Sequence, residues 1–332
     1  RPDPGTDGSA AVKGFILAAG LGERLRPLTD EMPKPLVPVL NLPAICYSLI
    51  LLKEAGIKDI IINLHYRQED IRTFFARHRD FGCRITFSFE EEILGTGGGL
   101  KNCEALLGDS PFVLLNSDVI MDLDLTGVLN LFLAKSPPGL LVLQERADAA
   151  EIGPVALRED RIADFKNFLK TGIPGRCIYT GGAVLSPMIF PYLTEEFSSV
   201  VYTGYVDLIR NHRLDFCLHK GRWFDIGGLR SCWESSMALL KDFGFWQSRA
   251  GEYLGMEMNP VHPQASLGKG VVVDQSVVGE GSVVGGGSRI EKTLLFPGSR
   301  VGRGVCLRNC IVMGTQVFDL TKDPPTISAL PS

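Results

Sequence analysis

Residues 17–35 read LAAGLGERLRPLTDEMPKP, and this stretch decides the fold of the amino-terminal part of the chain. An apolar run from residue 14 to residue 19 stops at a glycine bend, Gly20-Leu21-Gly22. A strand that ends in glycines presents bare backbone N–H groups at its carboxyl end, where parallel sheets bind their ligands. Cationic side chains that can hold a polyphosphate follow the bend, and they are Arg24, Arg26 and Lys34. The stretch therefore predicts a phosphate-binding turn after a buried strand.

The glycine spacing differs from that of the two common phosphate-binding loops. No Lys-Ser or Lys-Thr pair follows the glycines, and Leu25 stands where a dinucleotide-binding loop has its third glycine. Two glycines after a strand also make an ordinary tight turn without a ligand. As a whole, however, residues 17–35 closely resemble the signature of the sugar-1-phosphate nucleotidyltransferases. The departure is Glu23, which replaces the threonine that often precedes the first arginine.

This resemblance implies both a fold and a reaction. The fold is a Rossmann-like α/β domain with a doubly wound, mixed and mostly parallel sheet, followed by a short left-handed parallel β-helix. The reaction transfers a nucleotidyl group from an NTP to a sugar 1-phosphate and releases pyrophosphate. The resemblance also implies Mg²⁺ as the cofactor.

Length and composition agree with a globular enzyme of more than one domain. The chain has 332 residues, of which 45% are hydrophobic and 22% charged, with a formal net charge of -4. A negative balance argues against a nucleic-acid-binding protein, and no apolar run is long enough to span a membrane. We expect a disordered tail at residues 1–11, a nucleotidyltransferase domain at 12–250 and a β-helix at 260–320.

The eight cysteines indicate the compartment. They are scattered, and no two form a C-x-x-C pair. Scattered cysteines in a long chain are usually reduced and buried, so we expect a cytoplasmic protein without disulfides. The five histidines form no zinc-binding pattern.

Strands and helices alternate through the first part of the chain, which predicts a sheet covered on both faces. The predicted strands are residues 15–19, 59–64, 83–89, 111–115, 140–144 and 179–185. The predicted helices are residues 44–55, 68–79, 206–211 and 228–242.

The carboxyl-terminal part has a six-residue rhythm of apolar residues. Its positions are Val272, Val278, Val284 and Ile290 and, after one five-residue step, Leu295, Val301 and Leu307. Such repetition is typical of a parallel β-helix, in which every sixth side chain stacks inside. The segment has room for about three coils of roughly eighteen residues. We expect the β-helix to join subunits into a homo-oligomer.

A second glycine-rich segment, residues 90–100, reads EEEILGTGGGL. By itself it also fits a flexible hairpin tip. Beside the first motif it resembles the loop with which the family reads the nucleobase. The nucleotide-binding residues that the resemblance implies are Ala18, Gly20, Gly22, Glu91, Gly95, Thr96 and Ser117.

Two aspartates stand at the ends of apolar strands. Asp118 follows the run Leu114–Ser117, and Asp225 precedes Ile226-Gly227 in a Trp-Phe-Asp-Ile-Gly sequence. Mg²⁺ prefers one or two carboxylates together with phosphate oxygens and water. The resemblance makes Asp118 and Asp225 the metal ligands, with Arg24 holding the leaving pyrophosphate and Lys34 balancing charge on the transferred group.

The resemblance becomes weaker in the acceptor region. Phe168 stands where the family carries a lysine that meets the sugar phosphate, and Lys166 or Lys170 would have to replace it. Gly153 and Gly181 match glycines that lie near the sugar in the family. We therefore expect the sugar phosphate to bind near Gly153, Lys166 and Gly181.

The motif Asn116-Ser117-Asp118-Val119-Ile120 is most similar to the mannose-1-phosphate guanylyltransferases. GDP-mannose, made from GTP and mannose 1-phosphate, is therefore the preferred product. A UDP- or dTDP-sugar pyrophosphorylase and a catalytically silent regulatory relative remain open. A β-helix acyltransferase is disfavoured, because residues 263–332 contain no histidine.

Overall fold

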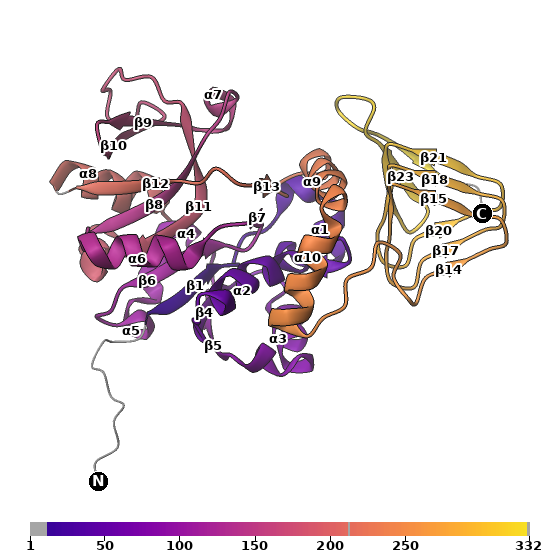
Figure 1. Ribbon diagram of the computed structural model, residues 1–332, viewed down its shortest axis with the longest axis horizontal. Helices are drawn as coiled ribbons and strands as arrows, with labels where there is room; N and C mark the ends of the chain where they lie inside the picture. Colours follow the sequence, from indigo (N-terminus) through magenta and orange to yellow (C-terminus); the bar gives the residue numbers. More distant parts are fainter. Residues whose placement is uncertain (1–11, 212, 331–332) are drawn as a thin grey trace, which may run out of the picture.

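The computed structural model describes residues 12–211 and 213–330, so the tail expected at residues 1–11 lies outside the described residues. An α/β part and a stack of short strands make up the described chain (Figure 1). Two helices, α9 (Leu229–Lys241) and α10 (Phe243–Arg249), lie between these parts. Among the helices of the described residues, none has both the length and the apolar character needed to cross a membrane.

A nine-stranded sheet with the order β5-β4-β1-β6-β11-β8-β12-β10-β9 forms the centre of the α/β part. Its first four strands are parallel, and they are β5 (Arg84–Phe89), β4 (Asp59–Leu64), β1 (Lys13–Leu17) and β6 (Phe112–Asn116). The remaining strands are β11 (Cys177–Leu185), β8 (Gly139–Glu145), β12 (Leu214–Leu218), β10 (Arg161–Phe165) and β9 (Pro154–Arg158).

The prediction of a mixed sheet is confirmed, but the sheet is less parallel than expected. Beyond β6, the pair β8–β12 is parallel, whereas β11 runs antiparallel to both its neighbours and β9 and β10 form an antiparallel hairpin. Hairpins need no crossover helix, so this half of the sheet is built from shorter connections.

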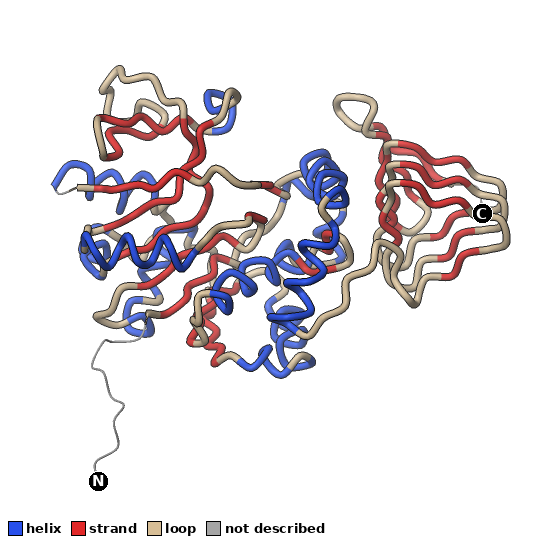
Figure 2. Tube along the Cα trace, viewed as in Figure 1, coloured by secondary structure: helices blue, strands red, loops and turns tan. Residues whose placement is uncertain are grey.

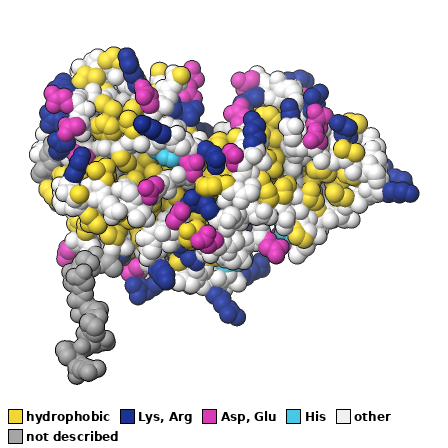
Figure 3. All heavy atoms as spheres, viewed as in Figure 1, with side chains coloured by type: hydrophobic (Ala, Val, Ile, Leu, Met, Phe, Trp, Pro, Cys, Tyr) yellow, Lys and Arg dark blue, Asp and Glu magenta, His cyan; other side chains and the backbone are white. Residues whose placement is uncertain are grey.

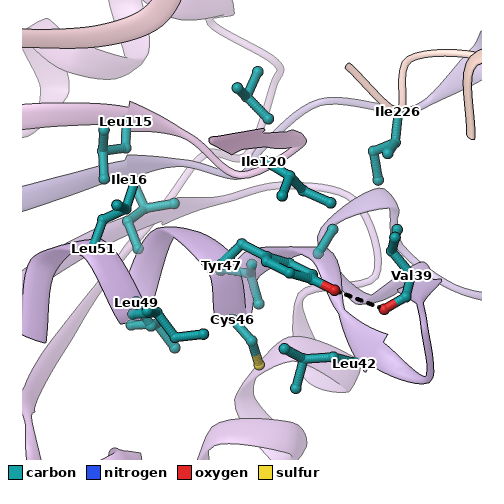
Figure 4. Close-up of a cluster of buried hydrophobic side chains, with 14 of the residues drawn as sticks. Ile16, Val39, Leu42, Cys46, Tyr47, Leu49, Leu51, Leu115, Ile120 and Ile226 are labelled. Atoms are coloured by element: carbon teal, nitrogen blue, oxygen red, sulfur yellow. Dashed lines mark hydrogen bonds between the residues drawn. The ribbon is translucent and has the colours of Figure 1, made fainter. Parts of the chain in front are cut away.

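Both faces of the sheet are buried, as the apolar strands require. Neighbouring residues Phe15 and Ile16 of β1 point to opposite faces and join different apolar clusters. On one face, Ile16 and Leu115 pack against α2 (Ala44–Glu54), and the hydroxyl of Tyr47 donates a hydrogen bond to Val39 O at 3.0 Å (Figure 4). The two clusters hold the strand ends, and hence the loops beyond them, in fixed positions.

The α/β part contains seven further helices among the described residues. They are α1 (Leu28–Glu31), α3 (Gln68–Arg77), α4 (Gly95–Asn102), α5 (Glu104–Leu107), α6 (Leu125–Lys135), α7 (Ala149–Ile152) and α8 (Val206–Asn211). A π-helical turn, η5 (Val201–Tyr205), leads into α8.

Two parallel three-stranded sheets and one five-stranded sheet, whose first three strands are parallel, form the carboxyl-terminal part, and Figure 2 shows their strands in stacked rows. The first contains β14 (Ser266–Leu267), β17 (Val283–Val284) and β20 (Arg300–Val301). The second contains β15 (Val272–Asp274), β18 (Arg289–Glu291) and β21 (Cys306–Arg308). The third contains β16 (Val277–Val278), β19 (Leu294–Leu295) and β22 (Cys310–Met313) and continues into β23 (Gln316–Asp319) and β24 (Thr326–Ala329).

The register of these sheets corrects the expected repeat. Val277 pairs with Leu294, which pairs with Ile311, so equivalent positions are 17 residues apart rather than about eighteen. The difference arises because each coil has three sides, two of which take six residues while the third, such as Ile290 to Leu295, takes five. In consequence Val272 is exposed, and its neighbour Val273 aligns with the buried Ile290. These sheets are consistent with the predicted β-helix.

Helix α9 connects the two parts through specific contacts. The indole of Trp233 donates to Lys292 O at 2.8 Å, and the guanidinium of Arg230 donates to Leu320 O at 2.7 Å. Leu294 and Ile311 belong to the same apolar cluster as α2 and β1. On the face shown in Figure 3, acidic and basic side chains are interspersed over both parts. The repeat strands therefore pack against the α/β part through a shared core.

The corrected register gives a direct test. Val278→Ala removes two methyl groups from a fully buried position and should cost about 2 kcal/mol of stability, whereas Val272→Ala, at a position that is half exposed, should cost little. The measurement is chemical denaturation of both variants. Equal losses would contradict the inward and outward assignment of these valines.

Candidate active site

The glycine bend after β1 has two different glycines. Gly22 has φ +69°, and a Cβ there would lie 2.8 Å from Cγ2 of Thr29. The hydroxyl of Thr29 also donates to Gly22 O at 2.8 Å, so the turn itself requires glycine at this position. A Cβ on Gly20 would instead meet open space. Gly22 therefore shapes the bend, while Gly20 leaves room beside it.

A pocket opens beyond the carboxyl ends of β1, β4 and β6, and we call it the glycine-turn pocket. Six of the seven predicted nucleotide-binding residues line it, together with Lys34 and Asp118; these six are Ala18, Gly20, Gly22, Gly95, Thr96 and Ser117. The seventh, Glu91, is exposed and does not line the pocket. The structure thus brings the first and second glycine segments to one cavity.

Glu90, not Glu91, is the glutamate that connects these segments. Its carboxylate is buried and accepts hydrogen bonds from the Asn63 amide at 2.7 Å and from Leu94 N at 2.9 Å. Asn63 in turn accepts a bond from Ala18 N at 2.8 Å. Sequence reasoning missed Asn63, whereas Glu90 stands four residues before Leu94, at the position of the glutamate in the family pattern.

The glycine-rich segment was expected to be a loop, and this prediction is wrong, because Gly95 begins helix α4. A Cβ on Gly98 would lie 2.3 Å from Glu196 O, and one on Gly97 would lie 2.5 Å from Oγ of Ser198. Two hydrogen bonds join the start of α4 to residues 196–200 of the same chain. Gly97 N donates to Ser198 O at 2.8 Å, and Val200 N donates to the Thr96 hydroxyl at 3.0 Å. The glycines admit the backbone of residues 196–200.

Replacing one of these glycines tests this close packing. Gly98→Ala should lower the melting temperature, because its methyl group meets a backbone carbonyl that cannot move aside. Gly244→Ala is the matched control, since Gly244 lies in α10 with open space around it and alanine favours helices. A Gly98→Ala variant as stable as wild type would contradict the proposed packing role.

The two predicted metal-binding aspartates meet through a two-stranded ribbon. Asp118 immediately precedes β7 (Val119–Met121), which pairs antiparallel with β13 (Trp223–Asp225). Asp225 lies opposite Val119, and Ile226 N donates to Asp118 O at 3.1 Å. Residues far apart in the sequence therefore lie side by side.

Two cations accompany these carboxylates. The ammonium of Lys34 forms an ion pair with Oδ2 of Asp118. A Cβ on Gly227 would lie 2.6 Å from Nη2 of Arg24 and 2.9 Å from either carboxylate oxygen of Asp225, so these two side chains flank the same glycine. The four predicted catalytic residues are thus gathered at one place.

Burial raises the pKa of the Asp225 carboxyl above its ordinary value, and the Asp118 carboxylate raises that pKa further, while Lys34 and Arg24 oppose the shift. The fold therefore disfavours the ionised form of Asp225. A divalent cation would remove this cost. Two neighbouring carboxylates are the hard oxygen donors that Mg²⁺ prefers, so Asp118 and Asp225 fit this metal.

The direction of this pKa shift predicts a gain in stability. A raised folded-state pKa means that stability is lost as pH rises from about 4, the ordinary aspartate value, through the folded pKa. In metal-free protein, Asp225→Asn should therefore raise the melting temperature at pH 7, and the difference should shrink towards pH 4.

Asp148 provides a control of opposite sign. Its pKa is lowered, chiefly by the hydrogen bond from Arg146, so Asp148→Asn should not stabilise the protein at pH 7. Melting curves of both variants across this pH range make the measurement. An Asp225→Asn protein that melts below wild type at pH 7 would contradict the assigned cost of ionisation.

A second pocket adjoins the first, and we call it the Trp223 pocket. Its lining comprises Arg24, Asn116, Asp118, Val119, Glu151, Ile152, Tyr179, Thr180, Gly181, Trp223 and Asp225. Among the described residues, Asn116 and Asp118 line both pockets. The indole of Trp223 donates to Thr180 O at 2.9 Å. The two pockets thus meet at the carboxyl end of β6.

The structure separates the three predicted acceptor-side residues. Gly181 lines the Trp223 pocket, but Gly153 and Lys166 do not. A Cβ on Gly153 would lie 2.7 Å from Cε of Lys166, so the lysine side chain runs along this glycine. Phe168 is half exposed, and its ring lies 5.1 Å from that of Tyr202. Tyr179 and Glu151, which stand within two residues of the predicted glycines Gly181 and Gly153, also line the Trp223 pocket, although neither is among the predicted site residues.

Comparisons with known proteins agree with this geometry. The family described as "Nucleotidyl transferase" matches residues 13–242. The chain is 29% identical over 337 residues to a mannose-1-phosphate guanyltransferase of Hypocrea jecorina, with 92% of each chain covered. A mannose-1-phosphate guanyltransferase of Candida albicans is 34% identical over 221 residues, which cover 65% of this chain and 61% of the relative.

Solved structures show a similar fold. An apo UDP-glucose pyrophosphorylase superposes with a TM-score of 0.61 at 22% identity, covering 70% of this chain and 99% of the other. HddC from Yersinia pseudotuberculosis complexed with GMP-PN gives a TM-score of 0.57 at 24% identity, covering 69% and 99%. Since the family match includes every element that builds the two pockets, the chain belongs to the nucleotidyl transferase family.

Proposed function

We propose that this nucleotidyltransferase makes GDP-mannose and pyrophosphate from GTP and mannose 1-phosphate. The observation that carries the proposal is the pair of adjoining pockets that share Asp118. One pocket is built for a nucleoside triphosphate and the other for the phosphate that attacks it. The choice of GTP and mannose rests on relatives described as mannose-1-phosphate guanyltransferases, at 29% identity over 92% of the chain.

In this proposal the glycine-turn pocket holds GTP, with the nucleobase beside Gly95 and Thr96. The open space at Gly20 lets phosphate oxygens approach the backbone. Lys34 balances charge beside Asp118. Arg24 is expected to hold the leaving pyrophosphate, and this role stays a prediction. Its side chain lines the Trp223 pocket beside Asp225 and does not line the glycine-turn pocket.

The reaction needs no covalent enzyme intermediate. A phosphate oxygen of the sugar phosphate attacks the α-phosphorus, one P–O bond forms, and the bond to the bridging oxygen of the leaving pyrophosphate breaks. The chain's own groups position the two substrates in line and neutralise charge. Asp118 and Asp225 would hold Mg²⁺, which when bound supplies charge neutralisation to the phosphates.

We also propose that the carboxyl-terminal sheets form a left-handed β-helix at residues 260–320 and that this element joins subunits of a cytoplasmic homo-oligomer. The 17-residue register across three parallel sheets supports the β-helix. The nucleotidyltransferase domain would then span residues 12–250, with the linker following α10.

Phe168 favours one other candidate, a catalytically silent relative that binds a nucleotide sugar. An aromatic ring packed on Tyr202 replaces the lysine that the family uses for the sugar phosphate. A UDP- or dTDP-sugar product also remains open. Pyrophosphate release separates all of these functions.

The experiment is to measure released pyrophosphate with Mg²⁺, each NTP and dTTP, and a panel of hexose 1-phosphates. We expect GTP with mannose 1-phosphate to be the best pair. Asp118→Asn and Arg24→Ala should each lower turnover at least ~10²-fold, the scale for loss of one preorganised charge-stabilising group. Wild-type turnover by either variant would refute the catalytic role proposed for the substituted residue. If wild-type protein released no pyrophosphate with any substrate pair, the proposed nucleotidyl transfer would be refuted.

A further inference from the structure

The proposed reaction leaves the acceptor phosphate without an obvious binding group. Phe168 cannot donate a hydrogen bond through its side chain, and the side chain of Lys166 runs along Gly153 outside the Trp223 pocket. A phosphate that approaches Asp118 and Asp225 needs donors to offset their negative charge. Such donors must line the Trp223 pocket where it meets the glycine-turn pocket.

Asn116 lies at that junction. It is the last residue of β6, and it lines both pockets. Its backbone is fixed, because it pairs with Leu17 of β1 and its carbonyl accepts a hydrogen bond from the Ser48 hydroxyl at 3.0 Å. Its side chain is only partly buried. Among the described residues, the hydrogen bond found at Asn116 outside the sheet is the one to its carbonyl, and the side-chain amide has no protein partner.

The shape of β11 determines where this amide lies. The pairing of β11 with β8 shifts register between Tyr179 and Ala183, and Gly181 within this bulge has φ +87°. A Cβ on Gly181 would lie 2.8 Å from Nδ2 of Asn116, so the amide packs directly against this glycine. Gly181 lines the Trp223 pocket and does not line the glycine-turn pocket. The amide nitrogen beside it therefore lies on the acceptor side of the junction.

We propose that Asn116 binds the phosphate of the sugar 1-phosphate, with its side-chain N–H donating to a phosphate oxygen. This inference rests on the proposed function and names the group that receives its acceptor. A neutral amide suits the position, because it can donate to the phosphate but carries no charge that would form an ion pair with Asp118 or Asp225 and so occupy the carboxylates expected to bind Mg²⁺. Arg24 lines the same pocket, so a cation already lies near the position of the acceptor phosphate, in addition to its expected role toward the pyrophosphate.

Binding and kinetics of Asn116→Ala test the proposal. A hydrogen bond to a charged group corresponds to roughly 10- to 100-fold in affinity, so KM for the sugar 1-phosphate should rise by that factor. The Kd of GTP with Mg²⁺, measured by calorimetry, should stay unchanged. Asn116→Asp should weaken binding of the sugar 1-phosphate more than Asn116→Ala does, because it places a third carboxylate beside Asp118 and Asp225. Asn130→Ala, at an exposed position of α6, is the matched control.

Direct binding of mannose 1-phosphate to protein saturated with the α,β-methylene analogue of GTP makes the test independent of turnover. Weaker acceptor binding by Asn116→Ala at wild-type melting temperature supports the proposal even if turnover is absent. Unchanged acceptor binding overturns it, as does an equal loss of affinity for GTP.

Lys166→Ala distinguishes the rival site. If this variant loses acceptor affinity and Asn116→Ala keeps it, the phosphate binds at the lysine and the proposal is wrong. Wild-type protein that binds the sugar phosphate without releasing pyrophosphate contradicts the proposed function alone. Wild-type protein that binds no sugar phosphate contradicts both.

Discussion

The pairing of β7 with β13 is the interaction on which the site depends. It places Asp225 opposite Val119 and directly beside Asp118, so two carboxylates from distant segments share one space. Two carboxylates that lie side by side repel each other when both are ionised, and burial strengthens this repulsion. The apolar clusters on both faces of the sheet supply the stability that holds the ribbon in this arrangement.

The surrounding charges show how this cost is limited in the protein alone. Lys34 bonds to Asp118, and Arg24 lies beside Asp225, so each carboxylate has a cation of its own. If Asp118 and Asp225 held Mg²⁺, their carboxylates would no longer need Lys34 and Arg24 as their main charge partners. Substrate phosphates would then offer new partners to the released cations. Binding of metal and nucleotide is therefore expected to be coupled through Lys34.

Much of the architecture was predictable from local sequence patterns. Strand β4 was predicted with its observed bounds, and α2 and α9 to within one or two residues, because apolar periodicity reports burial directly. The glycines of α4 were interpreted as a loop, since nothing in a single sequence reveals that residues 196–200 would press against them. Here a tertiary contact overrode local propensity.

The site shows the same division. The structure brings the glycine bend and both aspartates to neighbouring pockets, as expected for strand ends that converge at one edge of a sheet, while their roles stay predictions. The prediction of Glu91 is wrong, because Glu90 is the buried glutamate that bonds to Leu94 N, and of the three consecutive glutamates only Glu90 has the family's four-residue spacing to that leucine. The inward position predicted for Val272 is also wrong, because the step from Val273 to Val278 takes five residues, as the later step from Ile290 to Leu295 does. Both outcomes depend on how distant segments pack.

Helix α9 begins four residues after Asp225 and carries the contacts with the repeat strands. The hydroxyl of Ser235 on this helix also donates to Asp225 O at 3.3 Å. Helix α9 thus contacts Asp225 at one place and the repeat strands at another. A displacement of the carboxyl-terminal part would therefore reach the candidate active site through a single helix, so neither part is suited to being exchanged without the other.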